Sequence, residues 1–300
     1  MLAVTPVACA GIELAQPQLE GVEHRYATVR GMRLHYAEAG TGEPLVLQHG
    51  WPQHWYSWRE LIGPLAERYR VICPDLRGFG WSDAPAGGYD KAQLAQDLIG
   101  LLDALELDCV RLIGHDWGGF VGFLACLGHP ERISQFMPLS IPHLWPPEGP
   151  PDPRRLARAW YQVVIASPGL GPLAVGRLGF ARRILEQARA IGRFTQSELD
   201  LYEEALRRPA SLHASTQLYR TFLLHELRPL VQGHYRSKRL RTPTRLLVGE
   251  RDPIGRGLDR SFERYADDME LEWVPGAGHF LPEETPELVL ARALAFFGSS

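Results

Sequence analysis

The feature that most constrains this chain is a short run at residues 114–118, Gly-His-Asp-Trp-Gly, between two segments of different character. Residues 109–113 before it are mostly apolar and favour a strand, whereas residues 119–125 after it are compatible with a helix. A strand, a sharp turn and a helix in this order, with small residues two positions before and after the central one, are typical of a nucleophile elbow. The sequence therefore predicts that Asp116 is presented at the tip of a turn.

An aspartate at this position restricts the chemistry. Its carboxylate is already an anion at neutral pH and can attack carbon directly. It is a poor nucleophile for amide cleavage, but it suits displacement at an sp³ carbon that bears a leaving group. The product is an alkyl ester on Asp116, which water must hydrolyse. An ordinary esterase or lipase needs a serine, and no G-x-S-x-G motif occurs in the chain.

Length, net charge, hydropathy and cysteine spacing restrict the class of protein to which this chain can belong. The 300 residues suffice for one large α/β domain, or for one domain with an insertion. The net charge of -3 argues against a nucleic-acid partner. No apolar run reaches the roughly 18 residues that a membrane span needs. We expect residues 1–20 to form a flexible leader and the protein to be cytoplasmic. The four cysteines lack C-x-x-C spacing, so we interpret them as small buried hydrophobic residues.

Short apolar segments alternate with helical patterns along most of the chain. Residues 23–29 and 32–38 predict an antiparallel pair at a sheet edge. Further strands are predicted at 44–48, 70–73, 110–113, 133–139, 244–248 and 271–274. Helices are predicted at 56–67, 91–106, 118–128, 258–268 and 285–297. This alternation predicts an α/β fold with a mostly parallel, eight-stranded sheet that is flanked by helices.

The alternation stops between residues 143 and 235, where we find no convincing strand. The segment opens with a Pro-rich run at 145–153, and helical patterns follow at 154–166, 180–190, 197–206 and 211–226. We interpret residues 143–235 as an all-helical cap inserted into a core made of 21–142 and 236–300.

Two further residues could complete a catalytic set with Asp116. Asp252 lies just past the predicted strand 244–248, and His279 lies in a glycine-flanked loop after strand 271–274. Catalytic groups in open α/β sheets gather at the carboxyl ends of strands. His279 could activate water and Asp252 could orient it, although Glu250 is a second acid in the same loop.

An oxyanion formed during ester hydrolysis needs hydrogen-bond donors. Strand 44–48 runs into His-Gly-Trp-Pro at 49–52. The backbone N–H groups of Trp51 and Trp117 could therefore bind the negative charge.

Taken together, these segments resemble the epoxide hydrolase family of the α/β-hydrolase superfamily. The matching segments are 49–52, 55–59, 75–83, 114–119, 249–252 and 276–280, within a resemblance that spans about residues 25–297. The resemblance implies an α/β-hydrolase fold with Asp116, Asp252 and His279 as nucleophile, acid and base, in the chain order of that fold.

The cap separates two related activities. Epoxide hydrolases hydrogen-bond the epoxide oxygen with two cap tyrosines, and the resemblance gives these roles to Tyr161 and Tyr219. Haloalkane dehalogenases hold a halide with N–H donors, one from the Trp after the nucleophile and often one from an Asn after His-Gly. Trp117 fits both families, whereas Trp51 stands where the Asn would be. The sequence therefore favours an epoxide hydrolase, with a haloalkane dehalogenase as the alternative.

These residues suggest a substrate class. We expect Trp51, Phe120, Trp160 and Phe280 to line a pocket for a hydrophobic epoxide, which reacts with water. No motif for a metal ion or an organic cofactor is present, so we expect none. A catalytically silent, ligand-binding hydrolase fold is a further alternative. The sequence leaves a homodimer open.

Overall fold

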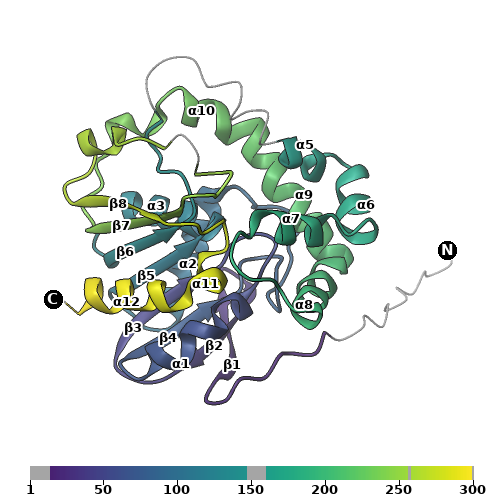
Figure 1. Cartoon of the computed structure of the whole chain (residues 1–300), viewed down its shortest axis with the longest axis horizontal. Coiled ribbons are helices and arrows are strands. Elements are labelled where there is room, and N and C mark those ends of the chain that lie inside the picture. The colour runs from purple at the N-terminus through teal and green to yellow at the C-terminus, as the bar shows by residue number, and fades with distance from the viewer. Residues whose placement is uncertain (1–13, 147–159, 256–257, 299–300) are drawn as a thin grey trace, which may run out of the picture.

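Eight strands form one mixed sheet in the computed structural model, which describes residues 14–146, 160–255 and 258–298 (Figure 1). The strands are β1 (Glu23–Val29), β2 (Met32–Ala39), β3 (Glu43–Gln48), β4 (Tyr69–Pro74), β5 (Val110–His115), β6 (Ile133–Leu139), β7 (Thr244–Gly249) and β8 (Met269–Val274). Their order is β1-β2-β4-β3-β5-β6-β7-β8. Strand β2 pairs antiparallel with β1 and β4, and all other pairs are parallel. The predicted sheet is confirmed.

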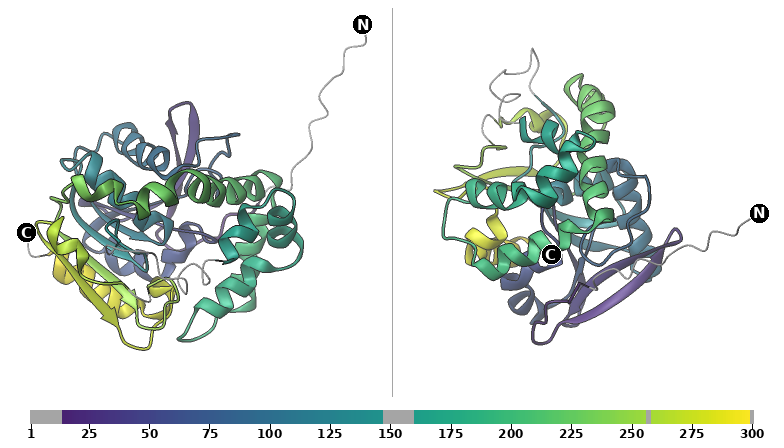
Figure 2. Two further views of the ribbon diagram at one scale, coloured as in Figure 1. Left: turned by 90° about the horizontal axis from the view of Figure 1, so that it is seen from above. Right: turned by 90° about the vertical axis from the view of Figure 1, so that its right-hand side faces the viewer.

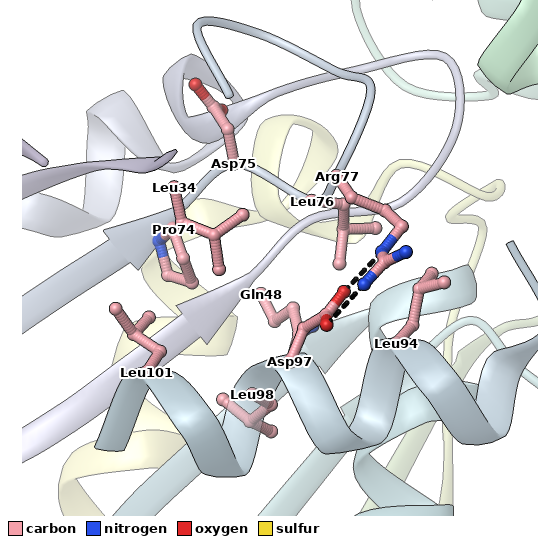
Figure 3. A pocket seen from close by; sticks show the side chains of 10 residues that line it. All are labelled: Leu34, Gln48, Pro74, Asp75, Leu76, Arg77, Leu94, Asp97, Leu98 and Leu101. Carbon is pink, nitrogen blue, oxygen red and sulfur yellow. Dashed lines mark hydrogen bonds and ion pairs between the residues drawn. The ribbon is translucent and has the colours of Figure 1, made fainter. Parts of the chain in front are cut away.

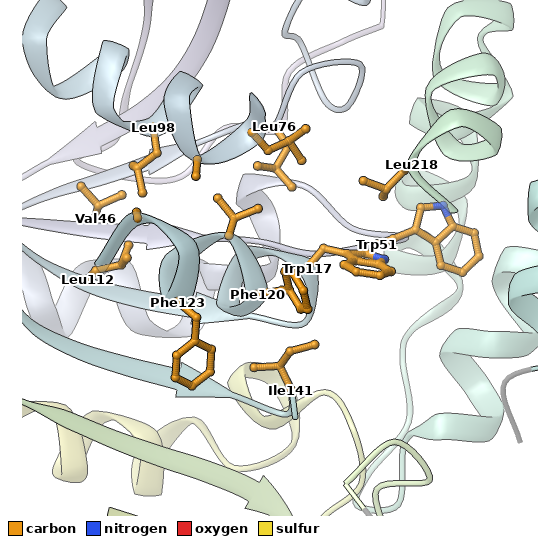
Figure 4. Close-up of a cluster of buried hydrophobic side chains, with 14 of the residues drawn as sticks. Val46, Trp51, Leu76, Leu98, Leu112, Trp117, Phe120, Phe123, Ile141 and Leu218 are labelled. Atoms are coloured by element: carbon orange, nitrogen blue, oxygen red, sulfur yellow. The ribbon is translucent and has the colours of Figure 1, made fainter. Parts of the chain in front are cut away.

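Helices cover both faces of this sheet because its central strands are apolar on both sides. Helices α1 (Arg59–Ala66) and α12 (Pro286–Phe297) share a buried cluster with Leu45 and Leu47. Helices α2 (Lys91–Ala104) and α3 (Trp117–Gly128) pack in a second cluster with Val46, which points to the opposite face (Figure 4).

The chain between β6 and β7 forms helices joined by loops, and it contains no strand in the residues that the structure describes. Its main helices are α5 (Trp160–Ala166), α6 (Leu170–Arg177), α7 (Phe180–Ala188), α8 (Gln196–Arg207), α9 (Pro209–Thr221) and α10 (Leu227–Val231). A π-helical turn, Phe222–Glu226, joins α9 to α10. Figures 1 and 2 show these helices gathered on one side of the sheet, as a cap. Shorter elements in the core are Trp55–Trp58, His234–Ser237, Ser261–Arg264 and α11 (Leu281–Glu284).

The predicted helix at 258–268 is wrong. This segment contains only a 3₁₀ turn, Ser261–Arg264. The Asp259 carboxylate accepts the Ser261 N–H at 3.0 Å, and Ala266 pairs with Leu240 in an isolated β-bridge. Side-chain and bridge bonds of this kind compete with those of a helix.

Two other local predictions also differ from the structure. Helix α6 lies in a stretch that we did not predict as helical, because its glycines and proline are weak helix formers. Close packing explains it, since a Cβ on Gly176 would meet the Leu212 side chain of α9. Cys109 is exposed rather than buried, because it precedes β5 instead of lying within it.

Some predictions lie partly outside the described residues. They concern the leader up to residue 13, most of the Pro-rich run and the first part of the predicted helix 154–166. Of the leader, Leu14 accepts a hydrogen bond from the Trp81 indole at 2.8 Å, and Leu19 packs against the core. In the described residues, no helix is both long and apolar enough to cross a membrane.

Helix α3 approaches the end of β3 closely, and Gly118 permits this. A Cβ at this position would meet the backbone carbonyl oxygens of Gln48 and His49. Neither oxygen can move without shifting the loop that follows β3, so this contact places the loop relative to α3.

We predict that Gly118→Ala lowers the free energy of unfolding by about 1–3 kcal/mol, the usual cost of overpacking. Gly128, at the other end of α3, has open space around a Cβ. Gly128→Ala should therefore leave stability unchanged or raise it by up to about 1 kcal/mol. Urea unfolding of both variants tests this, and equal stabilities would show that the approach to β3 is not tight.

Candidate active site

Asp116 lies at a sharp turn between β5 and α3. Its backbone has φ 52° and ψ -122°, a positive φ that is uncommon for a residue other than glycine. Such a conformation costs on the order of 1–3 kcal/mol and persists only where its surroundings enforce it. Gly114 contributes, because a Cβ there would lie 2.6 Å from the Gly118 carbonyl oxygen. The turn holds the Asp116 carboxylate out of the sheet, as the elbow motif predicts.

The loop after β3 supplies a donor to this carboxylate. The Trp51 backbone N–H donates to Asp116 Oδ1 at 2.9 Å. Gly50 allows the approach, because a Cβ there would collide with the Asp116 side chain. Trp117 begins α3, so its N–H has no partner within the helix. The Trp51 N–H thus lies against the nucleophile, and the Trp117 N–H belongs to the residue that follows it in the chain.

His279 lies between two carboxylates. Its Nδ1 is 3.1 Å from Asp252 Oδ2, and its Nε2 is 3.5 Å from Asp116 Oδ2. Burial lowers the pKa of His279, but the charge of Asp252 and the hydrogen bond with Asp116 outweigh it and raise the pKa from 6.5 to about 10. His279 is therefore an imidazolium at neutral pH while Asp116 carries its negative charge.

Asp252 is fully buried and fixed in place. Its Oδ1 accepts the Ile254 N–H at 2.8 Å, which leaves Oδ2 for His279. Glu250, the other acid of this loop, is exposed and accepts the Gly276 N–H at 3.0 Å. The geometry therefore places Asp252, and not Glu250, against the imidazole.

The loop that carries His279 is held by Glu284, a residue that sequence reasoning missed. The Glu284 carboxylate accepts four backbone N–H groups at 2.8 to 2.9 Å, from Gly278, Phe280, Ala190 and Ile191. The His279 N–H donates to Ala188 at 2.8 Å, so the loop is also tied to the cap. The sequence signal that could have revealed Glu284 is an acidic residue in the first turn of a helix, shortly after the histidine.

Two neighbouring histidines support this geometry. His115 Nε2 bonds to the His279 carbonyl oxygen at 2.8 Å, and burial lowers the pKa of His115 to about 4. His49 Nδ1 bonds to the Gly50 carbonyl oxygen at 2.9 Å, and its Nε2 accepts the Leu76 N–H at 3.0 Å. Both rings therefore hold the loops around the nucleophile in place through hydrogen bonds to the backbone.

The cap brings both predicted tyrosines to one place. Tyr161 lies on α5 and Tyr219 on α9, with ring centroids 6.1 Å apart. The Tyr219 ring also lies 5.4 Å from that of Trp51 and 5.5 Å from that of Trp117. Burial raises the pKa of both hydroxyls, and the negative charge of Asp116 raises it further. The phenols are therefore neutral donors near the nucleophile.

The predicted pocket residues do not all lie together. Phe120 is buried against Trp117, with ring centroids 5.8 Å apart. Phe280 is fully buried beside His279, with centroids 5.0 Å apart. Trp160 is 55% exposed, and its ring packs on that of Phe180 of the cap. Trp51 and Phe120 therefore share the aromatic surroundings of Tyr219 and Trp117, whereas Trp160 faces outward.

A separate small pocket lies between the sheet and α2 (Figure 3). Its lining combines leucines with the ion pair between Arg77 and Asp97. Asp75 at its edge accepts the Trp55 N–H at 2.8 Å and so helps to fix the loop after β3. None of the predicted catalytic residues lines this pocket. Within the described ranges, no group of three or more His, Cys, Asp or Glu residues could hold a metal ion.

Comparison with known proteins places the chain in a family with this fold. A family model for the alpha/beta hydrolase fold matches residues 43–286. The soluble epoxide hydrolase of a Corynebacterium species is 32% identical over 298 residues, which cover 92% of this chain and 97% of that protein. Epoxide hydrolase A of Mycobacterium tuberculosis is 30% identical, covering 91% of this chain and 96% of that protein.

A solved structure is similar over nearly the whole chain. The ligand-free epoxide hydrolase CorEH superposes with a TM-score of 0.83 at 32% identity, covering 92% of this chain and 99% of that one. The family match runs from β3 to the start of α12, and the relatives and the solved structure are similar over more than nine-tenths of the chain. The chain belongs to the α/β-hydrolase fold family and is related to the epoxide hydrolases within it.

Proposed function

We propose that this protein is an epoxide hydrolase, which converts a hydrophobic epoxide to a vicinal diol through a covalent ester on Asp116. The observation that carries the proposal is a carboxylate nucleophile near two neutral tyrosines, of which Tyr219 is buried and Tyr161 partly buried, and next to a histidine that a second carboxylate orients. The aromatic side chains of Trp51, Trp117 and Phe120 suit an apolar substrate.

Ring opening needs a nucleophile and a proton donor. Asp116 Oδ1 accepts the Trp51 N–H, so Oδ2 is the oxygen that attacks the epoxide carbon. Tyr161 and Tyr219 donate hydrogen bonds to the ring oxygen, because burial keeps both phenols protonated. A C–O bond to Asp116 forms, the ring C–O bond breaks, and the departing oxygen takes a phenol proton. The result is a hydroxyalkyl ester.

Ester formation also prepares the second step. It removes the negative charge of Asp116, which is one cause of the raised pKa of His279. The imidazolium then releases its proton, which restores the phenol, and the neutral ring takes a proton from water. Hydroxide adds to the ester carbon, and the Trp51 and Trp117 N–H groups stabilise the oxyanion. The alkoxide of the diol leaves with the proton of His279, and the acid proton left on Asp116 then passes to His279. One epoxide and one water thus give one diol, and the starting charges are restored.

One observation favours a second function, haloalkane dehalogenation. The Trp117 indole nitrogen is buried and forms no close hydrogen bond within the described residues, although its interaction with the Tyr219 hydroxyl lowers the pKa of that phenol. This indole N–H could instead donate to a departing halide. The tyrosine pair supports the epoxide reaction instead, because a halide leaves without needing a proton.

Product analysis separates these functions. We predict that the purified protein forms diols from aliphatic and aryl epoxides, and that Asp116→Ala lowers the rate by about 10⁴-fold or more. Asp108→Ala, at an exposed aspartate, is the control and should retain the wild-type rate. Bromide release from matched bromoalkanes without diol formation would identify a dehalogenase. Neither product over a broad panel would favour the ligand-binding alternative.

The two-step route predicts a trapped intermediate. In His279→Gln, attack by Asp116 continues while activation of water is lost, so the ester accumulates. Intact-mass spectrometry should show an adduct equal to the mass of the epoxide, and the double variant with Asp116→Ala should show none. Turnover by the wild type with no adduct in His279→Gln would mean that Asp116 activates water directly.

The charge coupling predicts a pH effect. The pKa of His279 is raised to about 10 in the folded state, so its contribution to stability is complete below about pH 6.5 and is lost as pH rises through about 10. The free energy of unfolding of the wild type should therefore fall across this window relative to that of His279→Gln. In Asp116→Ala, NMR of the imidazole should give a lower pKa for His279. An unchanged pKa would contradict the coupling between the two residues.

A further inference from the structure

A lysine is fully buried where the core meets the cap. The chain has two lysines, Lys91 and Lys238, and Lys238 is exposed. Lys91 is the first residue of α2, and its exposed fraction is 0%. Burial of an ammonium group is costly unless hydrogen-bond acceptors and opposite charge surround it. Its partners therefore indicate what the residue does.

The cap provides those partners. Lys91 Nζ donates to the Leu218 carbonyl oxygen at 2.6 Å and to Thr221 Oγ1 at 3.3 Å, and it pairs with Glu226 Oε2 at 2.7 Å. Glu226 Oε1 also accepts the Lys91 backbone N–H at 2.8 Å, so one carboxylate holds both ends of this residue. The contacts bracket the transition from α9 to the π-helical turn Phe222–Glu226.

This anchor adjoins the tyrosine site. Leu218, whose carbonyl Lys91 binds, directly precedes Tyr219 and belongs to the same buried cluster as Trp51 and Trp117 (Figure 4). Lys91 Nζ lies 4.8 Å from the centroid of the Trp117 ring, and that ring lies 5.5 Å from that of Tyr219. Lys91 thus contacts the backbone beside Tyr219 and a ring that packs against it.

We propose that Lys91 is a positioning residue, which fixes Tyr219 relative to Asp116 by anchoring the Leu218 carbonyl and Glu226 of the cap to the start of α2. The inference rests on the proposed function, because it assigns a purpose to the placement of Tyr219. A methionine of similar length could fill the same space, and a buried ion pair is weak support for stability. Burial lowers the pKa of Lys91 to about 8, and at pH 7 the ion pair with Glu226 is intact.

The rates of the two reaction steps distinguish a positioning role of Lys91 from a general loss of structure. Tyr219 acts in ring opening, whereas ester hydrolysis depends on His279 and Asp252. A displaced Tyr219 therefore slows ester formation and leaves ester decay at its normal rate. A variant that merely loosens the fold slows both steps.

The test is single-turnover kinetics, with excess enzyme and a styrene-type epoxide, on Lys91→Met and on the control Lys238→Met. Rapid quenching and intact-mass analysis give the rates of ester formation and decay. We expect Lys91→Met to slow formation by about 10- to 100-fold, the effect of misplacing a reacting group by about 1 Å. Its decay rate, and both rates of Lys238→Met, should match the wild type.

A double-mutant cycle with Tyr219→Phe tests the route of the effect. If Lys91 acts through Tyr219, Lys91→Met should slow ester formation by about 2-fold or less in the Tyr219→Phe background. An undiminished effect there, or equal slowing of formation and decay, would overturn the proposal. If Lys91→Met does not fold, Glu226→Gln removes the same ion pair and should slow formation selectively. No diol formation by the wild type contradicts the proposed function itself, whereas diol formation with a normal rate of ester formation in Lys91→Met contradicts this inference alone.

Discussion

The site depends on the close approach of the loop after β3 to the turn at Asp116. Gly50 and Gly118 lack the Cβ atoms that would separate these segments, so the Trp51 N–H reaches Asp116 Oδ1 at 2.9 Å. This hydrogen bond engages one carboxylate oxygen and leaves the other facing His279. The strained backbone of Asp116 is tolerated because strand, helix and loop enforce it together. The two oxygens of Asp116 therefore have different surroundings. This suits the proposed ester, in which one oxygen is bonded to the substrate and the other is the carbonyl oxygen.

The electrostatics follow from having two carboxylates around one imidazole. Asp252 is buried and lies 3.1 Å from His279 Nδ1, whereas Asp116 loses its charge when the ester of the proposed cycle forms. Asp252 and Asp116 both raise the pKa of His279, so in the proposed cycle this pKa falls when Asp116 becomes an ester. The imidazolium of the free protein cannot act as a base, whereas a neutral imidazole beside the ester could. In the proposed reaction the order of the two steps follows from this change of charge.

The sheet, and the closeness of Asp116, Asp252 and His279, could be predicted from sequence because their signals are local. Apolar strands with glycine-bounded turns marked β3, β5 and β7, and Asp252 and His279 follow strand ends. Two predictions failed because long-range contacts act on the segment. Helix α6 forms because it packs on α9. The helix expected at 258–268 is replaced by the bridge between Ala266 and Leu240, together with a local hydrogen bond to Asp259. Lys91 and Leu218 are 127 residues apart in the chain, so no local pattern reveals their bond. The exposure of Trp160 likewise depends on how α5 lies in the cap.

Long-range polar contacts, such as that between Lys91 and Leu218, lie at the boundary between core and cap, which we call the seam. At one side Lys91 binds Leu218 and Glu226, and at the other Glu283 accepts hydrogen bonds from Gln53 of the core and Tyr202 of the cap, each at 2.6 Å. Apolar surfaces alone tolerate sliding, whereas buried hydrogen bonds are satisfied in one arrangement only. The proposed reaction joins a nucleophile on the core to proton donors on the cap, two parts of the chain that share one buried cluster. Directional contacts on both sides of the seam fix the distance between them, which apolar area by itself would leave variable.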